Sequence, residues 1–300
     1  MSSRKQAGVD RRTFVAASTL GGLAILVPAA AATIPRKKIV NIATDDGRHV
    51  DVTFFRARGV RRGTILFSHG LRSAPKFYTR LFEPWSEAGY DVYAPLHLDS
   101  IDYPDYQRYR QEASWPARLH DMRAVAKLAA QDRFIAAGHS YGAVVALTLG
   151  GAAPAVPPGF TLESMQDHRV IAALSLSPPG VIPGLISTDT YSTVTVPTLV
   201  QTGDRDSFVP EIPWQSHLLA YDKAPAGHRY SLVLEGVDHG FGGLIYDPIM
   251  FAFKDQRAQL DEAMRLSVLF LNAFGTGDAA ALSELNRFAG QPGVAQLSQK

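Results

Sequence analysis

The chain has 300 residues and no cysteine, which excludes a disulfide framework, cysteine-ligated metals and a cysteine nucleophile. Hydrophobic residues make up 46% and charged residues 19%, a composition typical of a globular protein rather than a disordered one. The formal net charge is +2, but the first 32 residues hold four cations and one anion. The remainder is therefore nearly neutral, and we expect no basic surface for nucleic acid.

The first 32 residues have the three parts of an export signal. Arg11 and Arg12 precede an uncharged apolar run at 14–27, which ends at Pro28 and four alanines. The paired arginines resemble a twin-arginine translocation signal. The alternative is a retained membrane anchor, but the apolar core is shorter than the ~20 residues that a span needs. We expect an export signal over 1–32, membrane contact only through it, and a periplasmic or secreted protein.

Downstream of the signal, short apolar segments alternate with helical patterns. This alternation predicts an α/β fold with a mainly parallel central sheet and helices on both faces. Apolar runs at 39–43 and 50–55 flank Asp45-Asp46-Gly47 and predict an N-terminal antiparallel hairpin. The expected later strands are 63–67, 91–94, 133–137, 170–175, 198–201 and 230–234, and the expected helices are 77–88, 115–131, 141–149 and 256–274.

We expect a single catalytic domain over residues 33–275. Residues 276–300 are polar and interrupted by glycine, so they predict a loosely held C-terminal tail with at most a short helix near 279–288. Residues 181–195 lie between two expected core strands and are a candidate flap over a site.

A G-x-S-x-G pentapeptide stands between an expected strand and an expected helix. Its sequence is Gly138-His139-Ser140-Tyr141-Gly142. In this context the motif predicts a sharp turn that lifts the Ser140 hydroxyl above the sheet, and the two glycines avoid backbone collisions. The backbone N–H of Tyr141 would then face a reacting oxyanion beside the helix N-terminus.

A serine nucleophile needs a base and a residue that orients the base. In chain order, Asp206 follows the strand at 198–201 and His239 follows the strand at 230–234, so both fall at the edge where parallel sheets place their sites. Competing carboxylates are Asp204, which we expect to cap the turn, Asp238, which adjoins His239, and Glu235. We favour Asp206 as the carboxylate that orients His239.

The loop after the strand at 63–67 is expected to supply a second oxyanion donor. It reads Ser68-His69-Gly70-Leu71, and we choose the Leu71 N–H, with His69 as a structural ring that bonds the loop. We expect His139 to be packed inside the turn. We place three other histidines on the surfaces of helices or loops: His120, His168 and His217.

Together these segments resemble the α/β-hydrolase superfamily. The segments are GTILFSHG, AGHSYGAVVALTLGGA, RVIAALSLSPPG, PTLVQTGDRDSFVP and LEGVDHGFGG. More narrowly, they resemble serine esterases similar to dienelactone hydrolases and platelet-activating-factor acetylhydrolases. The resemblance implies Ser140 as nucleophile, Asp206 as acid, His239 as base, Leu71 and Tyr141 as oxyanion donors, and no metal or organic cofactor. True dienelactone hydrolases use a cysteine nucleophile, which this chain lacks.

Two further constellations remain open. His97 and Asp99, with Asp102 and Asp105 nearby, match no compact set of metal ligands, and we expect the carboxylates to be solvated. Three tyrosines recur at every third residue, and they form either a partly exposed face or an aromatic wall of the substrate pocket: Tyr103, Tyr106 and Tyr109.

The sequence as a whole predicts a serine hydrolase that cleaves carboxylic esters through an acyl-enzyme, with a small-molecule ester as its partner. One alternative is an acyltransferase or amidase that uses the same triad. Another is a non-catalytic binding protein of the same fold, against which the complete, correctly ordered triad argues.

Overall fold

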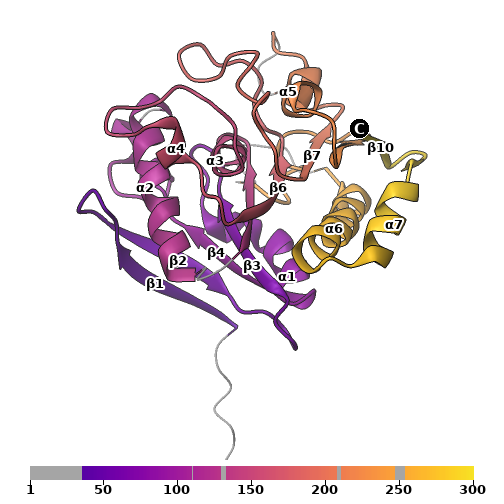
Figure 1. Cartoon of the computed structure of the whole chain (residues 1–300), viewed down its shortest axis with the longest axis horizontal. Coiled ribbons are helices and arrows are strands. Elements are labelled where there is room, and N and C mark those ends of the chain that lie inside the picture. The colour runs from indigo at the N-terminus through magenta and orange to yellow at the C-terminus, as the bar shows by residue number, and fades with distance from the viewer. Residues whose placement is uncertain (1–35, 110, 130–132, 208–210, 247–253) are drawn as a thin grey trace, which may run out of the picture. The chain divides into compact units, whose positions relative to one another are not determined.

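The computed structural model describes residues 36–109, 111–129, 133–207, 211–246 and 254–300 (Figure 1). The predicted export signal over residues 1–32 lies outside the described residues. Within the described ranges, no helix has both the length and the apolar character that crossing a membrane requires.

One sheet organises the described chain, and its central strands are parallel, as predicted. Six strands that are adjacent in the sheet run parallel to one another: β4, β3, β5, β6, β7 and β8. Antiparallel strands flank them on both sides. In sheet order the strands are β1 (Lys37–Ala43), β2 (His49–Phe55), β4 (Tyr90–Pro95), β3 (Gly63–Ser68), β5 (Phe134–His139), β6 (Val170–Leu176), β7 (Thr198–Gly203), β8 (Arg229–Leu234), β10 (Ala295–Gln299) and β9 (Gly290–Gln291).

Helices cover both faces of the sheet (Figure 1). Successive strand residues point to opposite faces, so Ile65 and Phe67 join one core and Leu66 joins the other. The first core is closed by α1 and α6, and the second by α2 and α3. The helices are α1 (Thr79–Glu87), α2 (Gln111–Ala129), α3 (Tyr141–Leu149), α4 (Leu162–Met165), α5 (Leu219–Lys223), α6 (Arg257–Leu271) and α7 (Ala279–Arg287), with short helices η1 (Pro75–Tyr78), η2 (Tyr106–Arg108), η3 (Trp214–Leu218) and η4 (Asn272–Thr276).

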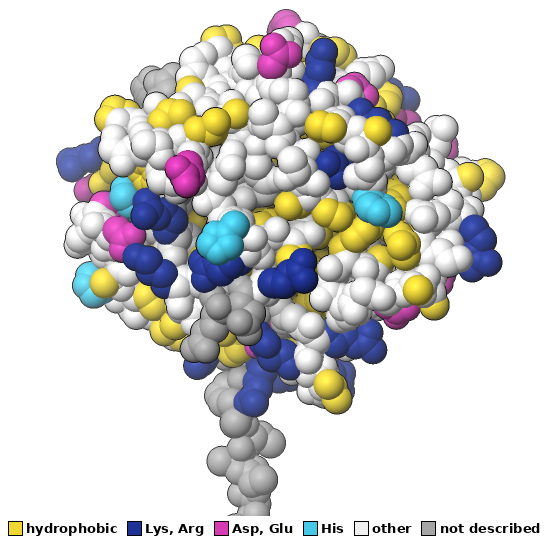
Figure 2. Space-filling view, in the orientation of Figure 1, with side chains coloured by type: hydrophobic (Ala, Val, Ile, Leu, Met, Phe, Trp, Pro, Cys, Tyr) yellow, Lys and Arg dark blue, Asp and Glu magenta, His cyan; other side chains and the backbone are white. Residues whose placement is uncertain are grey.

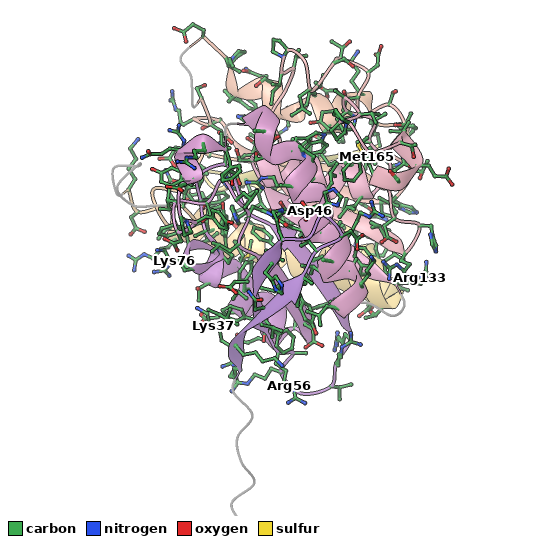
Figure 3. The ribbon with its side chains drawn as sticks, turned by 90° about the vertical axis from the view of Figure 1, so that its left-hand side faces the viewer. Lys37, Asp46, Arg56, Lys76, Arg133 and Met165 are labelled. Carbon is green, nitrogen blue, oxygen red and sulfur yellow. The ribbon has the colours of Figure 1, made fainter. Side chains whose placement is uncertain are left out.

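The predicted N-terminal hairpin is present as β1 and β2. Its strands pair antiparallel from Lys37 opposite Phe55 to Ala43 opposite His49. Figure 3 shows the hairpin from its outer side, with Lys37 and Arg56 near its open end and Asp46 at its turn. Asp46 accepts a hydrogen bond from Arg48 there at 2.7 Å, which ties the turn together.

The C-terminal segment differs from the expected loose tail. Residues 279–287 form α7, and β10 pairs antiparallel with β8 from Ala295 opposite Leu234 to Gln299 opposite Tyr230. Ala295 and Leu297 are buried against the first core, while Gln296 is exposed. The segment is held because its alternating side chains complete the apolar face beside the last parallel strand.

The surface carries charges of both signs. Figure 2 shows Lys and Arg side chains spread over one face, with Asp and Glu among them and small hydrophobic patches between. This mixture agrees with the nearly balanced charge of the chain after residue 32.

Candidate active site

Ser140 occupies a strained turn between β5 and α3. Its φ of 54° and ψ of −123° lie where residues with a side chain are rare. A Cβ at Gly138 would overlap the backbone of Gly142, and one at Gly142 would overlap the carbonyl oxygen of Ser68. The turn is held further by the Ser140 N–H, which donates to the Leu176 carbonyl at 2.8 Å. The glycines are therefore required by the closeness of β3, β5 and α3.

Of the candidate carboxylates, Asp206 is the one bonded to the His239 ring. His239 Nδ1 donates to Asp206 Oδ1 at 2.7 Å, and both side chains are buried. Asp204 instead accepts from the Gly236 N–H at 2.7 Å, as a turn cap would. Asp238 accepts from two backbone N–H groups of its own loop, and Glu235 is exposed.

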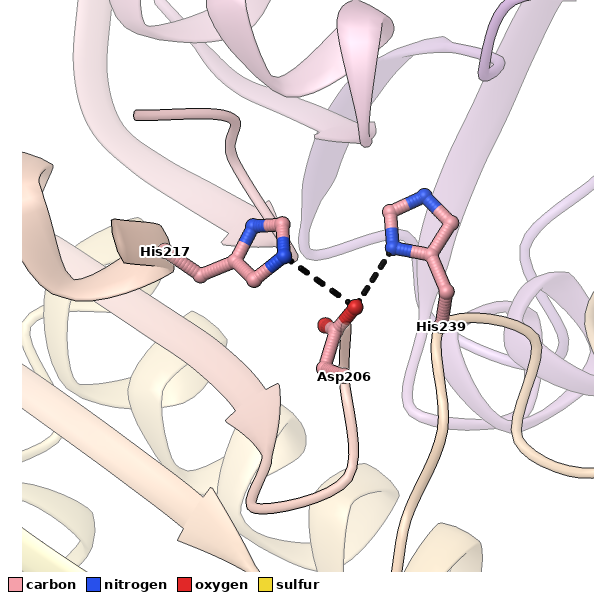
Figure 4. Close-up of side chains that lie close together, drawn as sticks. All are labelled: Asp206, His217 and His239. Carbon is pink, nitrogen blue, oxygen red and sulfur yellow. Dashed lines mark hydrogen bonds and ion pairs between the residues drawn. The ribbon is translucent and has the colours of Figure 1, made fainter. Parts of the chain in front are cut away.

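A second histidine, His217, binds the same carboxylate oxygen, and the prediction of a surface position for it is wrong. Its Nε2 lies 3.1 Å from Asp206 Oδ1, so the two rings approach this oxygen from opposite sides (Figure 4). Thr202 donates its hydroxyl to the other oxygen at 2.8 Å. His217 lies in η3 and belongs to no sequence motif, so the sequence did not indicate that its ring reaches Asp206 at the sheet edge.

The ionisation of Asp206 is set by these neighbours. Burial opposes its charge, but the electrostatic attraction of the His239 ring and the hydrogen bonds from both rings hold the pKa of Asp206 well below its ordinary value. Burial also opposes a charge on His217, yet the hydrogen bond and charge of Asp206 raise the pKa of His217 overall. The loop therefore holds an ionised carboxylate at the centre of the cluster.

Asp206, His217 and His239 are also the group of described residues whose ligand atoms are close enough together, within 4.8 Å, to suggest a metal ion. The two ring nitrogens, however, already meet one carboxylate oxygen at hydrogen-bond distances of 2.7 and 3.1 Å. An ion between these atoms would have to push them apart. Hydrogen bonding accounts for the cluster, and we assign no metal to it.

The residues predicted from separate loops meet in one cleft of about 660 Å³. Ser140, His239, Leu71 and Tyr141 all line it, and Asp206 lies behind His239. These positions follow the carboxyl ends of neighbouring parallel strands, as expected for such a sheet. The rest of the lining is mostly apolar and comes from three segments: Pro179, Gly180, Val181 and Ile182; Ile212, Pro213 and Leu219; and Tyr246.

The loop that carries Leu71 is held from below by a buried arginine. Arg118 of α2 donates to the carbonyl of His69 at 2.6 Å and to the carbonyl of Gly70 at 3.2 Å. Its guanidinium also binds both oxygens of Asp99, at distances of 2.9 to 3.1 Å, and both side chains are fully buried. The prediction that Asp99 is solvated is therefore wrong, because a bidentate cation compensates its buried charge.

A second serine–histidine–carboxylate arrangement lies beneath the same loop. His97 Nε2 lies 2.9 Å from Ser68 Oγ, and its Nδ1 lies 2.8 Å from Asp121 Oδ2. Burial lowers the pKa of His97, with Arg118 adding to the effect, and burial raises the pKa of Asp121 to about 7. Ser68, His97 and Asp121 are all buried away from the cleft lining, so this arrangement supports the loop instead of facing a ligand.

One chain of hydrogen bonds connects three loops of the site. The Gly70 N–H donates to the Tyr78 hydroxyl at 3.0 Å, and that hydroxyl lies 2.9 Å from His139 Nδ1. His139 Nε2 in turn lies 2.9 Å from the His239 carbonyl oxygen. A carbonyl only accepts, so His139 is protonated on Nε2 and accepts from Tyr78 on Nδ1. Burial, followed by the nearby His239, lowers the pKa of His139, in keeping with this neutral ring.

The remaining predictions are resolved by position. His69 is a buried structural ring, with Nδ1 2.7 Å from the Gly70 carbonyl oxygen, as we expected. The tyrosines that recur at every third residue are partly exposed, and none of them is among the described residues that line the cleft: Tyr103, Tyr106 and Tyr109. They form a partly exposed face and not a wall of the cleft. The candidate flap at 181–195 contributes Val181 and Ile182 to the cleft wall.

No protein-family model matches the chain, and no curated protein matches its sequence. Solved structures do match its fold. Esterase 2 of Thermogutta terrifontis, phosphorylated by paraoxon, is 16% identical, with a TM-score of 0.55 over 81% of this chain and 95% of that one. Est1E of Butyrivibrio proteoclasticus is 15% identical, with a TM-score of 0.52 over 78% and 97%.

A predicted CIB-like hydrolase of Thermoplasma acidophilum is 18% identical, with a TM-score of 0.52 over 78% of this chain and 98% of that one. At such identities the likeness concerns the fold. The order of the strands, the turn at Ser140 and these neighbours together lead to one conclusion: the chain has the α/β-hydrolase fold.

Proposed function

We propose that the protein is a serine hydrolase that cleaves carboxylic esters. The observation that carries the proposal is the bond from His239 to Asp206 in the cleft that Ser140 also lines. A serine on a strained turn, a histidine and an ionised carboxylate are the groups that nucleophilic acyl transfer needs. The esterases among the structural neighbours support the same reading by analogy of fold.

In the proposed reaction, Ser140 Oγ attacks the carbonyl carbon of the ester while its proton passes to His239 Nε2. Asp206 holds Nδ1 protonated, so Nε2 is the nitrogen that accepts. The backbone N–H groups of Leu71 and Tyr141 stabilise the oxyanion. The alcohol leaves with the proton from His239. Water then attacks the acyl-enzyme, gives a proton to His239, and releases the carboxylic acid as Ser140 regains its hydrogen.

The lining of the cleft favours esters with an apolar group. Its volume of about 660 Å³ accommodates a small molecule, and three apolar segments supply most of its wall. Charged side chains are few among the described residues of the lining, where they are Arg72, Glu211 and Asp222. We expect esters with a medium-length apolar acyl chain to be cleaved faster than acetates.

The test is hydrolysis of chromogenic esters of increasing acyl length by the purified protein and by Ser140→Ala. Removing the nucleophile should lower kcat by several powers of ten, on the order of 10⁶ in a well-studied protease. Retention of more than half of the activity would contradict the assignment. Matched circular dichroism and thermal unfolding of the variant would show that the fold is intact.

The alternative functions give different results in the same assay. An acyltransferase would turn over faster when an acceptor alcohol is added, and an amidase would prefer an anilide to the corresponding ester. A binding protein would show no burst of product. An organophosphate such as paraoxon would add one phosphoryl group to the wild type but none to Ser140→Ala if the serine is activated as proposed.

We also propose that the protein is exported by the twin-arginine route to the periplasm or beyond. Arg11 and Arg12 ahead of the apolar run at 14–27 support this proposal.

A further inference from the structure

His217 has an acceptor at each of its two ring nitrogens. Its Nδ1 lies 2.9 Å from the carbonyl oxygen of Pro178, and its Nε2 lies 3.1 Å from Asp206 Oδ1. A carbonyl oxygen only accepts hydrogen bonds, and so does an ionised carboxylate. A neutral imidazole carries one N–H, whereas the imidazolium carries two. The contacts on both sides are therefore satisfied only by the charged ring.

We propose that His217 is a permanently protonated positioning residue, a cation that shares the Asp206 carboxylate with His239. The Asp206 oxygens then receive three donors: the Thr202 hydroxyl and one N–H from each ring. His217 and Asp206 form a neutral pair in the resting protein. The base therefore faces a carboxylate whose charge is already compensated.

The pair changes the energetics of proton transfer to His239. The centroids of the two rings lie 5.6 Å apart, so a proton on His239 is repelled by the charge on His217. The proton that the base takes from Ser140 therefore adds a second positive charge beside His217, and removing the charge of His217 should remove this repulsion. This part of the inference rests on the proposed function, because it concerns the pH range over which the reaction runs.

Other titratable and charged groups lie around His217 and His239. His139 packs against His239 from the end of β5 and is the neutral ring described above. The pKa of His217 is raised by Asp206, in agreement with the geometry. Among the described residues that line the same cleft, the charged side chains are Arg72, Glu211 and Asp222.

Nitrogen-15 NMR of the histidine-labelled full-length protein tests the proton count directly. At about pH 7.5, one unit above the ordinary histidine pKa, His217 should show the two nearly equal nitrogen shifts of an imidazolium. His217→Gln identifies the signal, and His168, which is exposed, serves as the comparison ring in the same spectrum. One protonated and one unprotonated nitrogen on His217 would overturn the inference. This measurement requires no enzymatic activity.

The second test is the pH profile of kcat/KM for wild type, His217→Gln and the remote control His168→Gln. Glutamine is neutral but can still donate to Asp206. The acid limb should move upward by between about one and two pH units in His217→Gln, given the ring separation of 5.6 Å, and stay in place in the control. A uniform loss at every pH with an unmoved limb would mean a merely structural role and would contradict the proposal.

The two tests separate the possible failures. An imidazolium signal in a protein without esterase activity would keep the proton assignment and reject the proposed function. Esterase activity in a protein whose His217 is neutral would keep the proposed function and reject the proton assignment. If His217→Gln does not fold, His217→Asn is used in both tests. The signals of the wild-type His217 ring can also be assigned by correlating them with the Cβ of the same residue.

Discussion

Asp206 is the residue on which the geometry of the site depends. Three side chains donate to its carboxylate, and both histidines need it ionised. Asp206→Asn would retain size but remove the negative charge that both rings face, and an amide N–H turned toward His239 would favour the wrong tautomer of that ring. We expect kcat for an ester to fall by about 10⁴, as in a serine protease with the equivalent change.

Asp204→Asn is the matched control for that substitution. Asp204 lies two residues away and accepts from the Gly236 N–H, which an amide oxygen can also do. It should cost less than about tenfold in kcat, and stability should change only slightly. Measuring both variants on one ester decides the question. An inactive Asp204→Asn beside an active Asp206→Asn would mean that Asp204, and not Asp206, orients the base.

At this scale the sequence predicted the residues that belong to a motif and missed those that act through packing. Ser140, Asp206 and His239 could be chosen because the turn motif and the chain order restrict where each can stand. His217 belongs to no motif, and only the placement of η3 over the sheet edge brings it to Asp206. Arg118 and Asp99 were missed for the same reason, since a buried ion pair looks like two surface charges in a sequence.

Among the elements, the C-terminal strand β10 is one that the sequence pattern did not predict. The long periodic helices and the buried parallel strands have strong patterns and were predicted within a few residues of their observed bounds. In β10 the pattern rests on Ala295 and Leu297 alone, and Gly290 and Gly293 before them suggested a loop. Two apolar residues at alternate positions are too weak a signal until the neighbouring strand β8 is known.

β10 provides a test of how firmly the C-terminal segment is held. Leu297 is 7% exposed and packs in the first core, so Leu297→Ala should lower the free energy of unfolding by about 2–4 kcal/mol. Gln296→Ala, on the exposed side of the same strand, should change it by less than about 0.5 kcal/mol. Urea unfolding of both variants checks this; equal, negligible effects would mean that the strand is loosely attached in solution.

For the whole molecule, the export proposal gives a prediction that does not depend on catalysis. Replacing both arginines of the pair, Arg11→Lys with Arg12→Lys, keeps the charge but removes the twin-arginine motif. The precursor should then accumulate in the cytoplasm of a host that has this route. Cell fractionation and immunoblotting measure it, with Lys5→Arg as a control outside the motif. An unchanged periplasmic yield would refute the route.

The sheet order also fixes the distance between two strands that lie far apart in the sequence. β1 and β10 are eight strand spacings apart, and at ~4.8 Å per spacing this is roughly 38 Å. The segment from Lys37 to Gln299, when unfolded, has a radius of gyration of roughly 57 Å, so its ends lie much farther apart on average. The chain has no native thiol, so single cysteines at Lys37 and Gln299 could carry a fluorescent pair without background labelling. Energy transfer between them would report, in one distance, whether all the intervening strands are in place.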